Sequence, residues 1–250
     1  MIGLFDSGLG GLTVVRRVRE RLPQADCVFF SDQAHVPYGD RRQEDLHRLL
    51  RRNLAWLEER KPDAIVMACN TSCAIADLYG WPQTQARVFD IIDSAAIALK
   101  TVDARRIGVV ATTATVRSGA YARRIGAAIP SSLVIEVAAP ALVPLVEAGR
   151  IEGTDARDAV EEVCSRLPQR LDAVVLACTH YPILDAHFAA ILGDAVIRID
   201  PAFVQADRVA AFSQEYGCAI ESGITEYVTN GDVERFHASV SRIVGQPSHT

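Results

Sequence analysis

Lysine is almost absent from this 250-residue chain, in which Lys61 and Lys100 are the only two. Enzymes that use pyridoxal phosphate hold this cofactor on a lysine side chain. Lys61 precedes a proline at the start of an apolar run, and Lys100 lies in a segment with a helical pattern. Neither position suits that attachment, so we expect no pyridoxal phosphate.

Three further features are missing from the sequence. There is no excess of positive charge, since the formal net charge is −5, so neither nucleic acid nor an anionic membrane surface is an expected partner. There is no apolar run of the roughly 20 residues that a membrane-spanning helix needs. The first residues lack the charged and apolar regions of a signal peptide. With six scattered cysteines, we expect free thiols and a cytoplasmic protein.

One pattern occurs twice in the chain. Residues 63–71 read Asp-Ala-Ile-Val-Met-Ala-Cys-Asn-Thr, and residues 172–180 read Asp-Ala-Val-Val-Leu-Ala-Cys-Thr-His, 109 positions later. Each short, continuously apolar run is typical of a buried strand in a parallel sheet. The cysteines, Cys69 and Cys178, therefore lie at carboxyl ends of strands, where open α/β sheets bind their ligands.

A second repeat has nearly the same spacing. Residues 2–7 (Ile-Gly-Leu-Phe-Asp-Ser) resemble residues 107–112 (Ile-Gly-Val-Val-Ala-Thr) at an offset of 105. Two repeats in the same order predict an internal duplication, with two similar α/β lobes of parallel strands that face each other across a cleft. We expect residues 1–92 in the first lobe and 93–201 in the second. The other predicted strands are 27–31, 87–92, 133–138 and 196–199.

A glycine-rich turn follows the first predicted strand at residues 6–11, and a helix is expected from about Leu12 to Leu22. Such a turn can bind an anion through backbone N–H groups. It lacks the dinucleotide fingerprint, because the third glycine of that motif would fall at Thr13. A small carboxylate ligand is the favoured interpretation, while a nucleotide and a purely structural turn are the alternatives.

Two matched thiols suit the transfer of a proton from one face of a carbon atom to the other. A thiol with a pKa near 8.5 is accessible as both thiol and thiolate at neutral pH. We expect His180 to assist Cys178, and Asp6 to assist Cys69 from a neighbouring strand end. Donors for substrate carboxylates are the polar groups at strand ends: Ser7, Asn70, Thr71, Thr112, Thr115 and Thr179. Tyr38 lies in a loop that could line the same pocket.

Other interpretations use the same residues. Cys69, Cys73, Cys178 and His180 could be zinc ligands, although their spacing is weak for such a site, and we expect no metal. A cysteine nucleophile with His180 as its base would suit a hydrolase, but leaves Cys69 unexplained. Both cysteines could also be buried structural thiols.

Five motifs together resemble the glutamate racemase family of the aspartate/glutamate racemase superfamily. They are Asp6-Ser-Gly-Leu-Gly-Gly-Leu-Thr-Val14, Val36-Pro-Tyr-Gly39, Ala68-Cys-Asn-Thr71, Thr112-Thr-Ala-Thr115 and Cys178-Thr-His-Tyr-Pro182. The resemblance runs from residue 2 to about residue 236. It implies a fold of two Rossmann-like lobes, in which residues 202–250 return to the first lobe (residues 1–92 plus 202–250). It also implies a cofactor-independent isomerase that interconverts L- and D-glutamate, supplies D-glutamate for peptidoglycan, and often forms a homodimer.

The resemblance also implies roles for individual residues. Cys69 and Cys178 would be the acid/base pair, Asp6 and His180 their assistants, and Glu147 a further polar participant. The substrate would be held by Ser7, Tyr38, Gly39, Asn70, Thr71, Thr112, Thr115 and Thr179. The sequence departs from the pattern at Asp93, which would disfavour a dicarboxylate if it faced the site. An aspartate or hydantoin racemase, a malonate-type decarboxylase and a silent binding protein are the alternatives.

Overall fold

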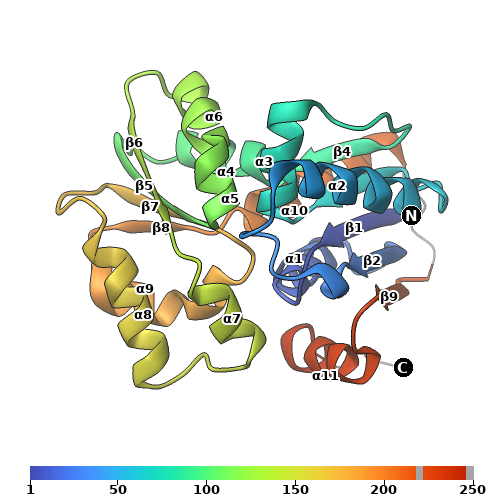
Figure 1. The fold of residues 1–250 in the computed structure, drawn as a ribbon. Coiled ribbons are helices and arrows are strands. Elements are labelled where there is room, and N and C mark those ends of the chain that lie inside the picture. The colour runs from blue at the N-terminus through green and yellow to red at the C-terminus, as the bar shows by residue number, and fades with distance from the viewer. Residues whose placement is uncertain (218–221, 246–250) are drawn as a thin grey trace.

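Two parallel sheets form the framework of the computed structural model, which describes residues 1–217 and 222–245 (Figure 1). The first sheet has the order β4-β3-β1-β2-β9, and its strands are β1 (Ile2–Asp6), β2 (Cys27–Ser31), β3 (Ala64–Met67), β4 (Arg87–Asp90) and β9 (Thr225–Thr229). The second has the order β6-β5-β7-β8, and its strands are β5 (Arg106–Ala111), β6 (Leu133–Ala138), β7 (Ala173–Ala177) and β8 (Ile197–Ile199). The predicted α/β class is confirmed.

The strand order bears out the duplication inferred from the repeats. Without β9, the first sheet reads β4-β3-β1-β2, and the second, read in the same direction, is β8-β7-β5-β6. Each strand of one sheet thus has a counterpart four strands later in the chain. The two strands that precede the thiols, β3 and β7, occupy equivalent places beside the central strands β1 and β5.

Helices accompany both sheets (Figure 1). Their bounds are α1 (Gly11–Arg21), α2 (Gln43–Glu58), α3 (Asn70–Tyr79), α4 (Ile91–Lys100), α5 (Thr113–Ser118), α6 (Ala120–Ala128), α7 (Leu142–Glu147), α8 (Thr154–Ser165), α9 (Asp185–Leu192), α10 (Ala202–Tyr216) and α11 (Val233–Ile243), with short 3₁₀ turns at Gln33–His35 and Tyr181–Leu184. Among the described residues, no helix is long and apolar enough to cross a membrane.

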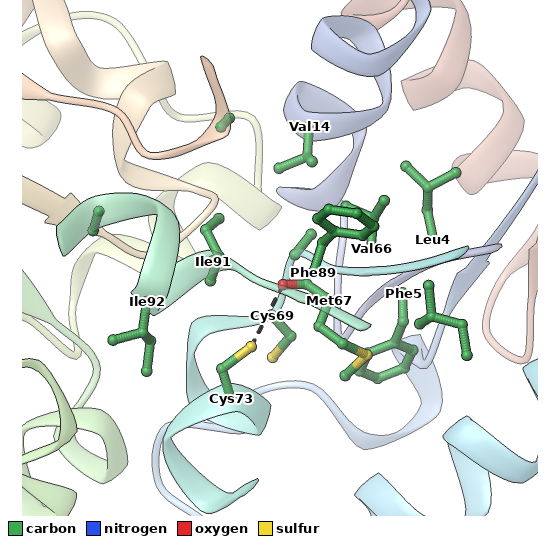
Figure 2. Packing of buried hydrophobic residues seen from close by; sticks show 14 of the residues in the cluster. Leu4, Phe5, Val14, Val66, Met67, Cys69, Cys73, Phe89, Ile91 and Ile92 are labelled. Carbon is green, nitrogen blue, oxygen red and sulfur yellow. Dashed lines mark hydrogen bonds between the residues drawn. The ribbon is translucent and has the colours of Figure 1, made fainter. Parts of the chain in front are cut away.

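The continuously apolar strands form the core because helices cover them. Phe5, Met67 and Phe89 on neighbouring strands of the first sheet are all buried (Figure 2). Cys73 lies one helical turn beyond Cys69, where its thiol donates to the Met67 carbonyl at 3.5 Å (Figure 2). Cys73 is therefore a core residue.

One predicted boundary was wrong. The apolar run at residues 87–92 suggested a strand to Ile92, but β4 ends at Asp90 and α4 begins at Ile91. The Asp90 carboxylate accepts a hydrogen bond from the Ile92 N–H at 2.7 Å and so caps the helix. Ile91 and Ile92 are buried in α4, and because buried strands and buried helices are both apolar, their hydrophobicity could not reveal the cap.

Asp90 should make the stability of the fold depend on pH. Burial, reinforced by the charge of Asp93, raises the pKa of Asp90 to about 6. Between about pH 4 and 6 the folded state therefore binds more protons than the unfolded state, so stability falls as pH rises through that window. Asp90→Asn keeps a capping oxygen and removes the buried charge. We expect it to raise the free energy of unfolding at pH 8 by about 1–3 kcal/mol.

Urea unfolding at pH 4, 6 and 8 measures this effect. The gain in the free energy of unfolding of Asp90→Asn should be small at pH 4. Asp103 is exposed, so Asp103→Asn should show no gain at any pH. A loss of stability in Asp90→Asn at pH 8 would contradict the assignment.

Candidate active site

The ends of β3 and β7 bring Cys69 and Cys178 to one small pocket of about 30 Å³ between the two sheets. Both thiols are buried. The pocket is lined by eleven of the predicted residues, Asp6, Ser7, Tyr38, Gly39, Cys69, Asn70, Thr71, Thr112, Cys178, Thr179 and His180. It is also lined by six residues that were not predicted site residues, although three of them belong to the quoted motifs: Val36, Pro37, Asp40, Thr113, Pro140 and Val143. The repeated motifs therefore predicted most of one continuous site.

Two predicted residues lie behind the pocket wall. Thr115 is fully buried, and its hydroxyl lies 2.9 Å from that of Thr112 and 3.4 Å from that of Thr71. Its contacts orient the two threonines that do line the pocket. Glu147, at the end of α7, contacts His180 from the side away from the thiol.

Helix N-termini supply positive potential to the pocket, although no lysine or arginine is among its lining residues. Cys69 is the N-cap of α3, and its sulfur accepts from the Ser72 N–H at 3.4 Å. Thr112 caps α5 in the same way, accepting from the Thr115 N–H at 3.3 Å. The free N–H groups of a helix start favour bound anions. The site is therefore suited to a carboxylate ligand.

Cys69 is held as a neutral thiol. Burial, followed by the negative charge of Asp6, raises the pKa of Cys69 to about 12. The thiol donates to the Ser7 hydroxyl at 3.5 Å. Asp6 acts on Cys69 through its charge, while its own hydrogen bonds go elsewhere. The Asp6 carboxylate accepts from the Gly11 N–H at 2.9 Å and from the Thr179 hydroxyl at 3.3 Å.

Burial also raises the pKa of Asp6 to about 6, although the charge of His180 and the N–H donors of the turn oppose it. Asp6 can therefore gain or lose a proton near neutral pH.

Cys178 lies beside a buried histidine–carboxylate pair. Its sulfur is 3.6 Å from Nδ1 of His180, and Nε2 of His180 is 2.6 Å from Oε1 of Glu147. Burial alone would lower the pKa of His180, but the contacts with Cys178 and Glu147 raise it well above its usual value. Burial likewise opposes ionisation of Glu147, yet His180 holds the pKa of Glu147 below its usual value. An imidazolium at this place stabilises an anionic sulfur when one forms.

The glycine-rich turn binds carboxylates, but they belong to the protein. The N–H groups of Gly8 and Gly11 donate to Asp6, and the N–H of Leu9 donates to Oε1 of Glu147 at 2.9 Å. The favoured interpretation, an external ligand on this turn, is therefore wrong for these three donors. Of the turn, Asp6 and Ser7 line the pocket.

Tyr38 lines the pocket, and its hydroxyl contacts two residues that do not. The hydroxyl donates to the carboxylate of Asp32, and the Asn53 side chain donates to the Tyr38 oxygen at 3.0 Å. Asp32 is fully buried and also accepts from Arg52 at 3.0 Å and from Asn230 at 2.5 Å. Asp32 thus fixes the pocket loop. Asp32 was not a predicted site residue, although its position directly after β2 was a usable signal.

Two concerns raised by the sequence are answered by the structure. Asp93 pairs with Arg124 at 3.0 Å and is not among the pocket residues, so its charge does not face the site. The zinc alternative needs Cys73 beside the other thiols, but Cys73 lies in the core. No group of three or more potential metal ligands occurs within residues 1–217 and 222–245.

Comparison with known proteins identifies the family of this chain. The family model for Asp/Glu/hydantoin racemase matches residues 12–207. The chain belongs to the Asp/Glu/hydantoin racemase family. The glutamate racemase of Synechococcus sp. is 43% identical over 87% of this chain and 81% of its own length.

Solved structures of family members agree with the fold. Glutamate racemase from Thermus thermophilus, in complex with β-chloro-D-alanine, is 33% identical with a TM-score of 0.86, over 98% of this chain and 93% of that one. Glutamate racemase from Francisella tularensis, in complex with D-glutamate, is 26% identical with a TM-score of 0.87 over the same shares. The predicted resemblance and the predicted isomerase class are confirmed.

Proposed function

We propose that this chain is a glutamate racemase that moves the α-proton of glutamate between Cys69 and Cys178. The observation that carries the proposal is the convergence of two thiols, from equivalent strands of two sheets, on one pocket. Family relatives named glutamate racemase, and the D-glutamate bound in one of them, support glutamate as the substrate.

The two thiols have different surroundings, which suits opposite roles in one turnover. The thiolate of Cys178, stabilised by the His180 imidazolium, removes the α-proton and leaves a planar carbanion. Cys69, whose pKa of about 12 keeps it protonated, then donates its proton to the opposite face. The product has inverted configuration, and the two sulfurs have exchanged protonation states. The enzyme in that form accepts the other enantiomer.

Substrate binding is proposed for the polar wall of the pocket. Hydroxyl and amide groups of Ser7, Asn70, Thr71, Thr112 and Thr179, with the loop at Tyr38 and Gly39, would hold the two carboxylates and the ammonium group. Thr115 would act by orienting Thr71 and Thr112. The carbanion is adjacent to a carboxylate that takes up negative charge, and the N-terminus of α3 stabilises that charge.

The pocket must open to admit the substrate. Its volume of about 30 Å³ suffices for one or two water molecules, whereas glutamate has ten non-hydrogen atoms. We propose that two lobes, residues 1–92 plus 202–250 and residues 93–201, move apart to bind it. The separate sheets within these two ranges support the division.

The resemblance also carries wider proposals. They are a supply of D-glutamate for peptidoglycan, a cytoplasmic location and a homodimer. The five cysteines described by the structure are free thiols, which suits a reducing compartment. The half-exposed Leu78 and Tyr79 at the end of α3 offer apolar surface for a partner subunit.

Circular dichroism of the amino acid tests the activity. Purified protein without added cofactor should convert L-glutamate and D-glutamate to the same racemic mixture. Aspartate under the same conditions should change at least a hundredfold more slowly. Racemisation of aspartate alone would reassign the substrate, and inertness with both would refute the proposal.

A further inference from the structure

Helix α11 comes from the C-terminal part of the chain and lies beside α7, which follows strand β6 of the second sheet (Figure 1). It is anchored to the first sheet by Phe236, which is fully buried and stacks on Phe29 of β2 at 6.2 Å between ring centroids. The backbone N–H of the preceding residue, Arg235, donates to the Asp232 carboxylate at 3.0 Å, and Asp232 thereby caps the helix. The start of this helix is therefore fixed in place.

Arg235 reaches across to the residue that contacts His180. Its guanidinium donates to the backbone carbonyl of Glu147. Glu147 is the last residue of α7, and the carbonyls at a helix C-terminus lack partners within the helix. A cation at this place satisfies the carbonyl and complements the negative end of the helix.

The carboxylate of Glu147 connects the end of α7 with the turn at Leu9 and with His180 after β7. Oε1 of Glu147 accepts from the Leu9 N–H at 2.9 Å and lies 2.6 Å from Nε2 of His180. The charged groups that act on Glu147 are His180 after β7 and Arg235 of α11, and Asp6 at the end of β1 is close enough for its pKa to be raised by Glu147. A Cβ at Gly8 would approach Oε1 to 2.5 Å, so little free space surrounds this oxygen.

We propose that Arg235 is a positioning residue for the Cys178 half of the reaction, acting by holding Glu147 against His180. The inference rests on the proposed function, in which the His180 imidazolium supports Cys178. Loss of the arginine frees the end of α7 and lengthens the Glu147–His180 contact. The protonated form of His180 then becomes less stable. Arg235 makes no hydrogen bond on the Cys69 side of the pocket, so its loss acts mainly on the Cys178 half of the reaction.

The test compares Arg235→Ala with Arg235→Lys, which keeps a cation. The matched control is Arg51→Ala, an exposed arginine of α2 without a hydrogen bond or ion pair to any described residue. We expect Arg235→Ala to lower kcat/KM roughly tenfold, Arg235→Lys to recover most of it, and the control to match wild type. The alkaline limb of the pH profile should move to lower pH in Arg235→Ala.

Isotope effects separate positioning from general structural damage. With α-deuterated substrates, the kinetic isotope effect on kcat/KM should grow for the enantiomer whose α-proton is removed by Cys178. It should shrink for the enantiomer whose α-proton is removed by Cys69. A loss of activity that leaves both isotope effects and the pH profile unchanged would overturn the inference, as would activity equal to the control.

A measurement without substrate keeps this inference separate from the proposed function. NMR titration of His180 should show a lower pKa in Arg235→Ala than in wild type, whether or not glutamate is the substrate. An unchanged titration would overturn the inference. Failure of wild type to racemise glutamate would refute only the proposed function.

Discussion

Cys69→Ser and Cys178→Ser are each expected to lower kcat/KM for racemisation by about 10³-fold or more. A serine hydroxyl is a far weaker acid than a thiol, so neither removal nor delivery of the α-proton proceeds at that position. Because the equilibrium constant of a racemisation is one, both directions must lose the same factor in kcat/KM. Ellipticity of L- and D-glutamate, followed separately, measures both.

Cys164→Ser is the matched control for the cysteine variants. Cys164 is also a buried free thiol, but it lies in α8 away from the pocket. It should keep activity within a factor of about two, since most of its effect is on packing. Thermal unfolding of all three variants shows whether lost activity reflects lost fold. A Cys69→Ser or Cys178→Ser protein with near wild-type racemisation would exclude that thiol as a base.

Gly10→Ala is expected to lower kcat/KM by about 100-fold or more, although the substitution adds one methyl group. The new Cβ would lie 2.7 Å from Nδ1 of His180 and closer still to the Thr179 hydroxyl. Real Cβ atoms do not approach that closely, so the turn and the His180 segment must separate. A displacement of about 1 Å in a catalytic group costs roughly 10²-fold.

Gly126→Ala distinguishes this clash from a general intolerance of alanine. Gly126 lies inside α6 with nothing within 4 Å of an added Cβ. We expect full activity and a gain in stability of about 1 kcal/mol, because alanine favours the helix. Activity and urea unfolding are measured for both variants. Wild-type activity in Gly10→Ala would mean that the close packing of this turn on His180 is not required.

The sequence alone predicted the fold because its strongest signal was a repeat. Continuous apolar runs defined the strands. Because the same run precedes Cys69 and Cys178, both thiols were placed at strand ends. The pairing of the two sheets around one pocket then follows from topology. Boundaries governed by a single cap, such as Asp90, could not be predicted from hydrophobicity.

The contacts that tune the site were mostly invisible in the sequence. Arg235 lies 88 residues along the chain from Glu147, whose carbonyl it contacts, and it belongs to no repeated motif. The role of the glycine-rich turn was misjudged for a related reason. Its N–H groups bind Asp6 and Glu147, and the second of these lies 138 residues away in the chain. Long-range pairing of this kind needs the three-dimensional structure.

The most direct test of the two-thiol account is the fate of the α-proton in heavy water during the first few per cent of conversion. Two bases on opposite faces predict that product glutamate carries deuterium, while the recovered substrate enantiomer still carries its original proton. The result should hold whether the reaction starts from L- or D-glutamate. Product that retains the substrate's proton, or substrate that gains deuterium faster than product forms, would contradict the account.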